Sequence, residues 1–102
     1  MKYKLFDLKI TTIGDKGTFN CSHIVGDGFF VCGEQIQFFE YTKQFSHYAL
    51  ATLLPYLAAK QRADDVNDWM YYESLIACPD PQCGALFSIE RTERAEYEYG
   101  EE

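Results

Sequence analysis

The chain has 102 residues, of which 47% are hydrophobic and 17% aromatic, and its formal net charge is −7. This length fits one domain with one core, and the apolar content excludes disorder over most of the chain. Nucleic acids and anionic lipids require a concentrated positive surface, and none is visible in this sequence. We therefore expect neither a nucleic acid nor a membrane as a partner.

The acidic excess is concentrated at the C-terminus. From residue 92 onward, five glutamates stand against Arg94 alone, so this segment supplies −4 of the −7. We expect a single α+β domain over residues 1–91 and an acidic tail over residues 92–102. Residues 1–7 contain no apolar stretch of the kind found in signal peptides. The sequence thus predicts a cytoplasmic protein whose four cysteines remain reduced.

The N-terminal part reads as strands separated by turns. Residues 4–11 alternate apolar and polar side chains, which is typical of a half-buried strand. After a glycine-containing turn at 14–17, we expect extended chain over residues 18–25.

A second turn, Gly26-Asp27-Gly28, leads into a short apolar strand over residues 29–32 that ends at Gly33. Residues 36–41 fit either a strand or an irregular lead-in to the following helix. Both interpretations stay open.

Residues 45–61 are predicted to form the one clear helix. Ser46 is the expected N-cap, because its hydroxyl can accept a hydrogen bond from a free backbone N–H of the first turn. Pro55 lacks the N–H that the Ala51 carbonyl would normally receive, so we expect a kink there. The predicted buried stripe comprises Phe45, Tyr48, Ala49, Leu53, Tyr56 and Leu57, widened by Leu50 and Leu54.

A polar loop over residues 63–68 precedes a predicted β-hairpin with strands at 70–77 and 85–91. In its second strand, Ala85, Phe87 and Ile89 share one face. The order of strands, one helix and a hairpin is typical of the α+β class. We expect a small antiparallel or mixed sheet packed against one Pro-kinked helix, with a C-terminal β-hairpin.

Four short motifs, in this order and spacing, carry a family resemblance. They are Lys9-Ile10, the segment from Cys21 to Asp27, Leu53-Leu54-Pro55-Tyr56 and the segment from Ala77 to Pro81. Together they resemble a family of small uncharacterised proteins, over about residues 4–91. The resemblance implies a type of domain and no particular activity.

Members of that family resemble one another in three cysteines. Cys21 and Cys78 match the first and the third of these, whereas the second position falls on Ser46. If the family's thiols hold a metal, the serine puts that site in doubt here. Cys32 and Cys83 are additional and either one would be able to compensate.

The residues that carry the strongest chemical signal are Cys21, His23, Cys78 and Cys83. Thiolates and imidazole suit zinc, and four of them would complete a tetrahedral site. Cys21 and His23 point to the same face if they lie on a strand. The spacing lacks the close cysteine pairs of zinc knuckles, and free cysteines are often simply buried small hydrophobes. The working expectation is no cofactor, with zinc or iron as the alternative.

A thiol nucleophile is a further interpretation. Cys78 stands at a turn close to Asp80, and either His23 or His47 would serve as its base. Against this, the chain is acidic and offers nothing that would lower the pKa of a thiol, and an aspartate between prolines commonly hydrogen-bonds within its own turn.

Two functions from different classes therefore remain. The one we favour is a non-catalytic accessory or ligand-binding module, with a protein partner or a second copy of the chain as its target. The alternative is a small metal- or thiol-dependent enzyme or redox protein that uses Cys21, Cys78 and a histidine. No catalytic residue is identifiable from the sequence.

Overall fold

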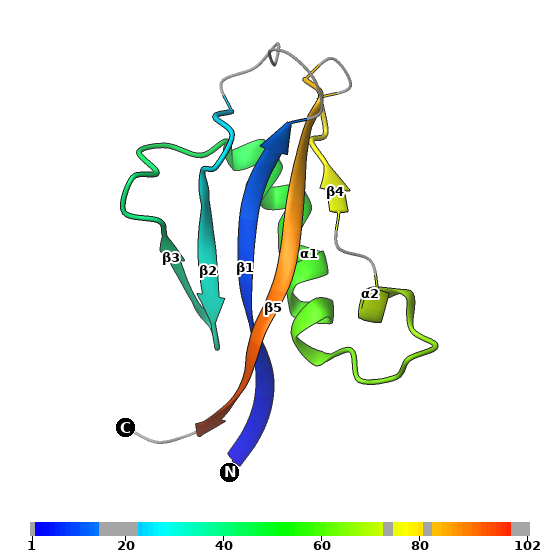
Figure 1. The fold of residues 1–102 in the computed structure, drawn as a ribbon. Coiled ribbons are helices and arrows are strands. Elements are labelled where there is room, and N and C mark those ends of the chain that lie inside the picture. Colours follow the sequence, from blue (N-terminus) through cyan, green and yellow to red (C-terminus); the bar gives the residue numbers. More distant parts are fainter. Residues whose placement is uncertain (1, 15–22, 73–74, 81–82, 99–102) are drawn as a thin grey trace.

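A five-stranded antiparallel sheet with strand order β3-β2-β1-β5-β4 forms the frame of the molecule (Figure 1). The structure is a computed structural model and describes residues 2–14, 23–72, 75–80 and 83–98. The strands are β1 (Lys2–Gly14), β2 (Gly28–Cys32), β3 (Gln35–Phe38), β4 (Leu75–Ala77) and β5 (Ala85–Glu98). The helices are α1 (His47–Arg62) and the single-turn α2 (Trp69–Tyr72). This arrangement confirms the α+β class, the antiparallel sheet and the one main helix.

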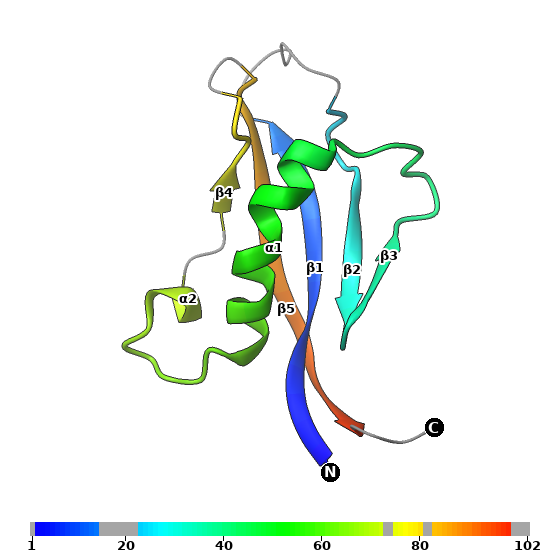
Figure 2. The same ribbon diagram turned by 180° about the vertical axis from the view of Figure 1, so that it is seen from behind.

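The helix α1 packs across one face of the sheet, where it covers the central strands (Figure 2). Because side chains alternate along a strand, every second residue of the central strands points toward the helix. The buried residues of this core are Leu8, Ile10, Phe29, Val31, Ala49, Leu53, Leu57, Phe87 and Ile89. The predicted alternation of burial is confirmed over residues 8–11, whereas Asp7, expected on the polar face, is buried, and the shared face of Ala85, Phe87 and Ile89 is confirmed.

The start of α1 agrees with the sequence, but its predicted stripe is too wide. The side chain of Ser46 accepts a hydrogen bond from the backbone N–H of Ala49, as expected of an N-cap. Tyr48 and Leu54 were expected to be buried, yet they are 70% and 46% exposed. Ala49, Leu53 and Leu57 are buried in the core, and Leu50 and Tyr56 are half-buried and pack against it. The helix continues through Pro55, and the kink stays a prediction.

The predicted first strand of the C-terminal hairpin, residues 70–77, is wrong for residues 70–72 and confirmed for residues 75–77, while residues 73–74 lie outside the described residues. Residues 69–72 form the turn of helix α2, and only Leu75–Ala77 pairs with β5. The carboxylate of Asp68 caps this turn by accepting from the N–H of Met70. Of residues 36–41, left open between strand and lead-in, residues 36–38 belong to the edge strand β3 and residues 39–41 do not.

Strand β5 continues past Arg91, where we expected the domain to end. Its residues pair with β1 as far as Glu98, which lies opposite Lys2. The Tyr97 hydroxyl donates to the Asp7 carboxylate, and the Tyr97 ring covers Gly33. Residues 92–98, placed in the acidic tail by the sequence, therefore belong to the sheet.

No helix in the described part of the chain is both long enough and apolar enough to cross a bilayer.

Candidate metal centre

The candidate site lies at the end of the sheet that is drawn uppermost in Figure 1, where β2 and β5 begin and β4 ends. His23 reaches it from the segment before β2. Two backbone hydrogen bonds fix this segment to β1, because the Thr12 N–H donates to Asp27 and the Gly26 N–H donates to Thr12. Gly26 adopts φ +98°, a left-handed conformation that glycine enters without steric cost. The turn predicted at residues 26–28 thus positions the imidazole.

Cys78 and Cys83 come from the connection between β4 and β5. The N–H of Cys78 donates to the Ala85 carbonyl, which extends the strand pairing by one residue. The N–H of Cys83 donates to the Asp80 carbonyl and closes a turn, and Gly84 follows with φ +83°. The two cysteines are therefore brought together at the base of one connection.

His23, Cys78 and Cys83 form what we call the thiol–imidazole cluster. The Cys78 Sγ and the His23 Nε2 are 3.6 Å apart. The potential ligand atoms of all three side chains lie within 4.8 Å of one another. Cys83 is buried, whereas His23 and Cys78 are half-buried. One imidazole nitrogen and two sulfurs thus converge on one small volume.

Cys83 is disulfide-bonded, whereas Cys32 and Cys78 are free. The expectation that all four cysteines remain reduced is therefore wrong for Cys83. A disulfide sulfur carries no thiolate charge and is not a metal ligand in that state. The cluster accordingly holds one free thiol, one imidazole and one oxidised sulfur.

The imidazole of His23 packs edge-on against two aromatic rings. Its centroid lies 5.1 Å from that of Phe87 and 5.9 Å from that of Phe45. Burial lowers the pKa of His23 below its usual value, and the carboxylate of Asp27 acts in the opposite direction. A neutral imidazole offers a lone pair to a thiol proton or to a metal ion.

A pocket of about 110 Å³ is lined in part by this imidazole. Its lining includes Asp27, Ser46 and His47, so the structure brings three of the predicted site residues, His23, Ser46 and His47, to one place. Ser46 acts there as the helix cap, and His47 is exposed. Asp80 is exposed and supplies the carbonyl of the cysteine turn.

Asp27 is a site residue that the sequence analysis missed. Its side chain is 8% exposed, and Thr42 Oγ1 lies 3.4 Å from its carboxylate. Its position between two glycines marked it only as part of a turn. The proximity to His23 depends on the pairing of that turn with β1, for which the sequence carries no signal.

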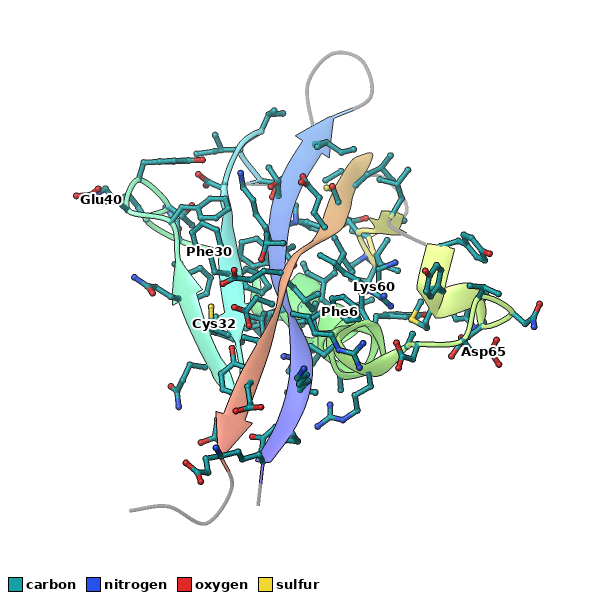
Figure 3. All side chains as sticks on the ribbon, turned by 60° about the horizontal axis from the view of Figure 1, so that its bottom comes forward. Phe6, Phe30, Cys32, Glu40, Lys60 and Asp65 are labelled. Carbon is teal, nitrogen blue, oxygen red and sulfur yellow. The ribbon has the colours of Figure 1, made fainter. Side chains whose placement is uncertain are left out.

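Cys21, the remaining residue of the predicted metal set, lies outside the described residues, as does most of the extended segment predicted at 18–25. The predicted proximity of Cys21 and Cys78 therefore stays a prediction. Cys32 lies elsewhere, exposed on β2 (Figure 3).

No family model, no curated protein and no solved structure matches this chain. The family resemblance thus rests on the four motifs alone.

Proposed function

We propose that this chain is a small non-catalytic binding module whose ligand is a thiophilic divalent metal ion, zinc in the first instance. The observation that carries the proposal is the convergence of the His23, Cys78 and Cys83 ligand atoms within 4.8 Å. The proposal combines the binding module of the first interpretation with the metal of the second, because the metal ion is the ligand that the module binds.

The separations within the cluster fit a tetrahedral zinc. With a Zn–S bond of about 2.3 Å and a Zn–N bond of about 2.0 Å, the nitrogen and sulfur ligands stand about 3.5 Å apart. The Cys78 Sγ and the His23 Nε2 already have a separation of 3.6 Å. Two thiolates on the same ion stand about 3.8 Å apart. No ligand pair of the cluster, at 4.8 Å or less, has to close by more than about 1.3 Å.

The donor types favour zinc over harder cations. Two thiolates and one imidazole are soft or borderline ligands, whereas calcium and magnesium require several oxygens. Iron is the second metal that this donor set suits. Three protein ligands leave a fourth position for water or another donor. Cys83 has to be a thiolate for this site to form, so the reduced protein is the one that binds.

Cobalt(II) offers a direct test, because it substitutes for zinc and gives visible absorption when thiolates bind it. We expect the fully reduced protein to bind one equivalent of cobalt with sulfur-to-metal charge-transfer bands, and zinc to displace it. His23→Phe keeps an aromatic ring beside Phe87 but removes the nitrogen ligand, and Cys78→Ser removes a thiolate. Both variants are expected to lose most of the affinity.

Cys32→Ser is the matched control, because it removes a thiol outside the cluster. It is expected to bind cobalt as the natural protein does. Circular dichroism spectra establish that each variant is folded. Folded, reduced protein without charge-transfer bands, or equal affinity in all four proteins, contradicts the proposal.

A second candidate function is association with another copy of the chain through β3. Within the described sheet, β3 is an edge strand, and all four of its residues are exposed, including Ile36 at 37% and Phe38 at 41%. Edge strands with apolar side chains are templates for pairing with another strand. Light scattering across a concentration series tests this: a dimer that Ile36→Lys dissociates supports it, and a monomer at all concentrations contradicts it.

A further inference from the structure

Cys83 belongs to two chemical arrangements that exclude each other. Its sulfur is part of a disulfide, yet it also lies with His23 and Cys78 in the only three-ligand group that the described residues contain. A sulfur atom in a disulfide has no charge to donate to a metal, whereas a thiolate ligand cannot simultaneously be oxidised. The oxidised and the metal-bound forms of Cys83 must therefore compete.

We propose that the thiol–imidazole cluster is a redox-gated metal site, in which the disulfide at Cys83 prevents metal binding and a bound metal ion prevents the disulfide from re-forming. This inference rests on the proposed function and adds its regulation. The free thiol of Cys78 and the imidazole of His23 are present in both states. Within the cluster, Cys83 is the residue whose oxidation state differs between them.

The chemical step requires a thiol reductant of the glutathione class. Two reductant thiols together supply two electrons and two protons, which convert the Cys83 disulfide into two cysteine thiols. The two reductant sulfurs become joined in one disulfide. Zinc then binds His23 together with Cys78 and Cys83, and the two ligating thiols each release a proton to solvent.

Zinc and reduction are thermodynamically linked, and the direction of the effect is fixed. An ion that binds only the reduced form stabilises that form, so the midpoint potential of the disulfide becomes less negative as zinc is added. For a two-electron couple, each tenfold excess of free zinc over its Kd shifts the midpoint by about 30 mV. Reciprocally, oxidation lowers the affinity for zinc by the same factor.

The test is a titration of the full chain in reduced and oxidised glutathione, with and without free zinc held constant by a chelator buffer. The fraction oxidised is read by trapping thiols with an alkylating reagent and weighing the protein by mass spectrometry. We expect a midpoint shift of about 30 mV for each tenfold step in zinc above the Kd. Cys32→Ser is expected to show the same shift.

His23→Phe is the decisive variant, because it retains both sulfurs and the disulfide but lacks the nitrogen ligand. Its midpoint is expected to be insensitive to zinc. If reduced protein binds zinc and the midpoint does not move, the gating is contradicted while the metal site stands. If reduced protein binds neither zinc nor cobalt, the metal site itself fails and the gating with it.

Discussion

The two ends of the sheet each carry a free cysteine, and their surroundings are opposite in character. At one end, Cys78 lies 3.6 Å from an imidazole nitrogen and close to a second sulfur. At the other end, burial and the carboxylates of Asp7 and Glu93 raise the pKa of the Cys32 thiol. The same residue type is thus presented once with a donor set for a metal and once among negative charges. The reactivity of each thiol therefore depends on the neighbours that the fold places beside it.

The same contrast holds for the backbone at the two ends. Near the cluster, a Cβ on Gly28 would clash with the Ile10 carbonyl oxygen and stand 2.9 Å from Phe39 Cε2. Near Cys32, a Cβ on Gly33 would stand 2.9 Å from Cε1 of the Tyr97 ring. At Gly28 the space for a Cβ is occupied by backbone, which cannot move aside. At Gly33 it is occupied by the Tyr97 ring, which can rotate away.

The largest expected effect is that of Gly28→Ala. Because the clash is with backbone, β2 has to separate from β1, and we expect a loss of about 3 kcal/mol in the free energy of unfolding. Chemical denaturation measures it. Gly33→Ala is the comparison: its φ of +62° is strained for alanine, but the Tyr97 ring can move, so a smaller loss is expected. Equal losses would contradict the distinction between the two ends.

Deletion of residues 95–102 is expected to have the next largest effect. It removes the pairing of β5 with the first residues of β1 and the Tyr97 contacts with Asp7 and Gly33. We expect a loss of about 2 kcal/mol, measured by urea denaturation. The acidic composition of the segment alone predicts almost no loss, so an unchanged stability would show that its pairing is not needed.

Tyr97→Phe removes only the hydroxyl that donates to Asp7. We expect a loss of about 1 kcal/mol, because the tyrosine is only half-buried and the Asp7 carboxylate loses a donor. Burial, then the bond to Asp7, raise the pKa of Tyr97 well above its usual value. The folded state therefore favours the protonated hydroxyl. The contribution of this hydroxyl to the free energy of unfolding is complete below about pH 10 and declines as the pH rises further.

Urea denaturation of Tyr97→Phe and the natural protein at pH 8 and above pH 10 measures this pair of effects. The difference between the two proteins should shrink at the higher pH. Tyr3→Phe is the control, since Tyr3 contacts the Tyr97 ring at 6.0 Å between centroids. A difference that is independent of pH would contradict the role of the hydroxyl.

The smallest expected effect concerns the reactivity of Cys32. Glu93→Gln removes one of the two negative charges that raise the pKa of this thiol, which increases the thiolate fraction. Burial and Asp7 contribute as well, so the increase in alkylation rate at pH 8 should stay below about tenfold, the change that one pKa unit produces. A Cys78→Ser background removes the other free thiol of the described residues, and peptide mass spectrometry follows the alkylation of Cys32 itself. A decrease in rate would contradict this account.

The sequence predicted those parts of the fold in which burial is periodic. The alternation around Phe6, Leu8 and Ile10 reports one covered face, and that face is what α1 covers. The turn at Trp69–Tyr72 was missed because its aromatic residues favour strands, and the capping carboxylate of Asp68 is a weaker signal. The exposure of Tyr48 and Leu54 depends on which side of α1 faces the sheet, and the apolar pattern of the helix was too broad to define that side.

For the candidate site, the sequence supplied the residue types but not their state. His23, Cys78 and Cys83 stood out because of the chemistry of their side chains, and their proximity follows from the pairing of β4 with β5 and of Asp27 with Thr12. The oxidation of Cys83 was not predicted, since the cysteines were assigned from the absence of an export signal. Ser46 was correctly predicted to cap α1, but its place in the lining of the pocket beside His23 was not predicted.

The pairing of the two terminal strands also determines how the molecule would respond to mechanical force. The outer ends of β1 and β5 lie side by side, with Lys2 opposite Glu98, at the end of the sheet away from the cluster (Figure 1). Tension applied to both ends would separate the paired residues of β1 and β5 one pair after another, beginning at Lys2 and Glu98, rather than shearing all pairs at once. The two strands would therefore begin to separate at low force, and their first residue pairs would be lost while the thiol–imidazole cluster was still intact.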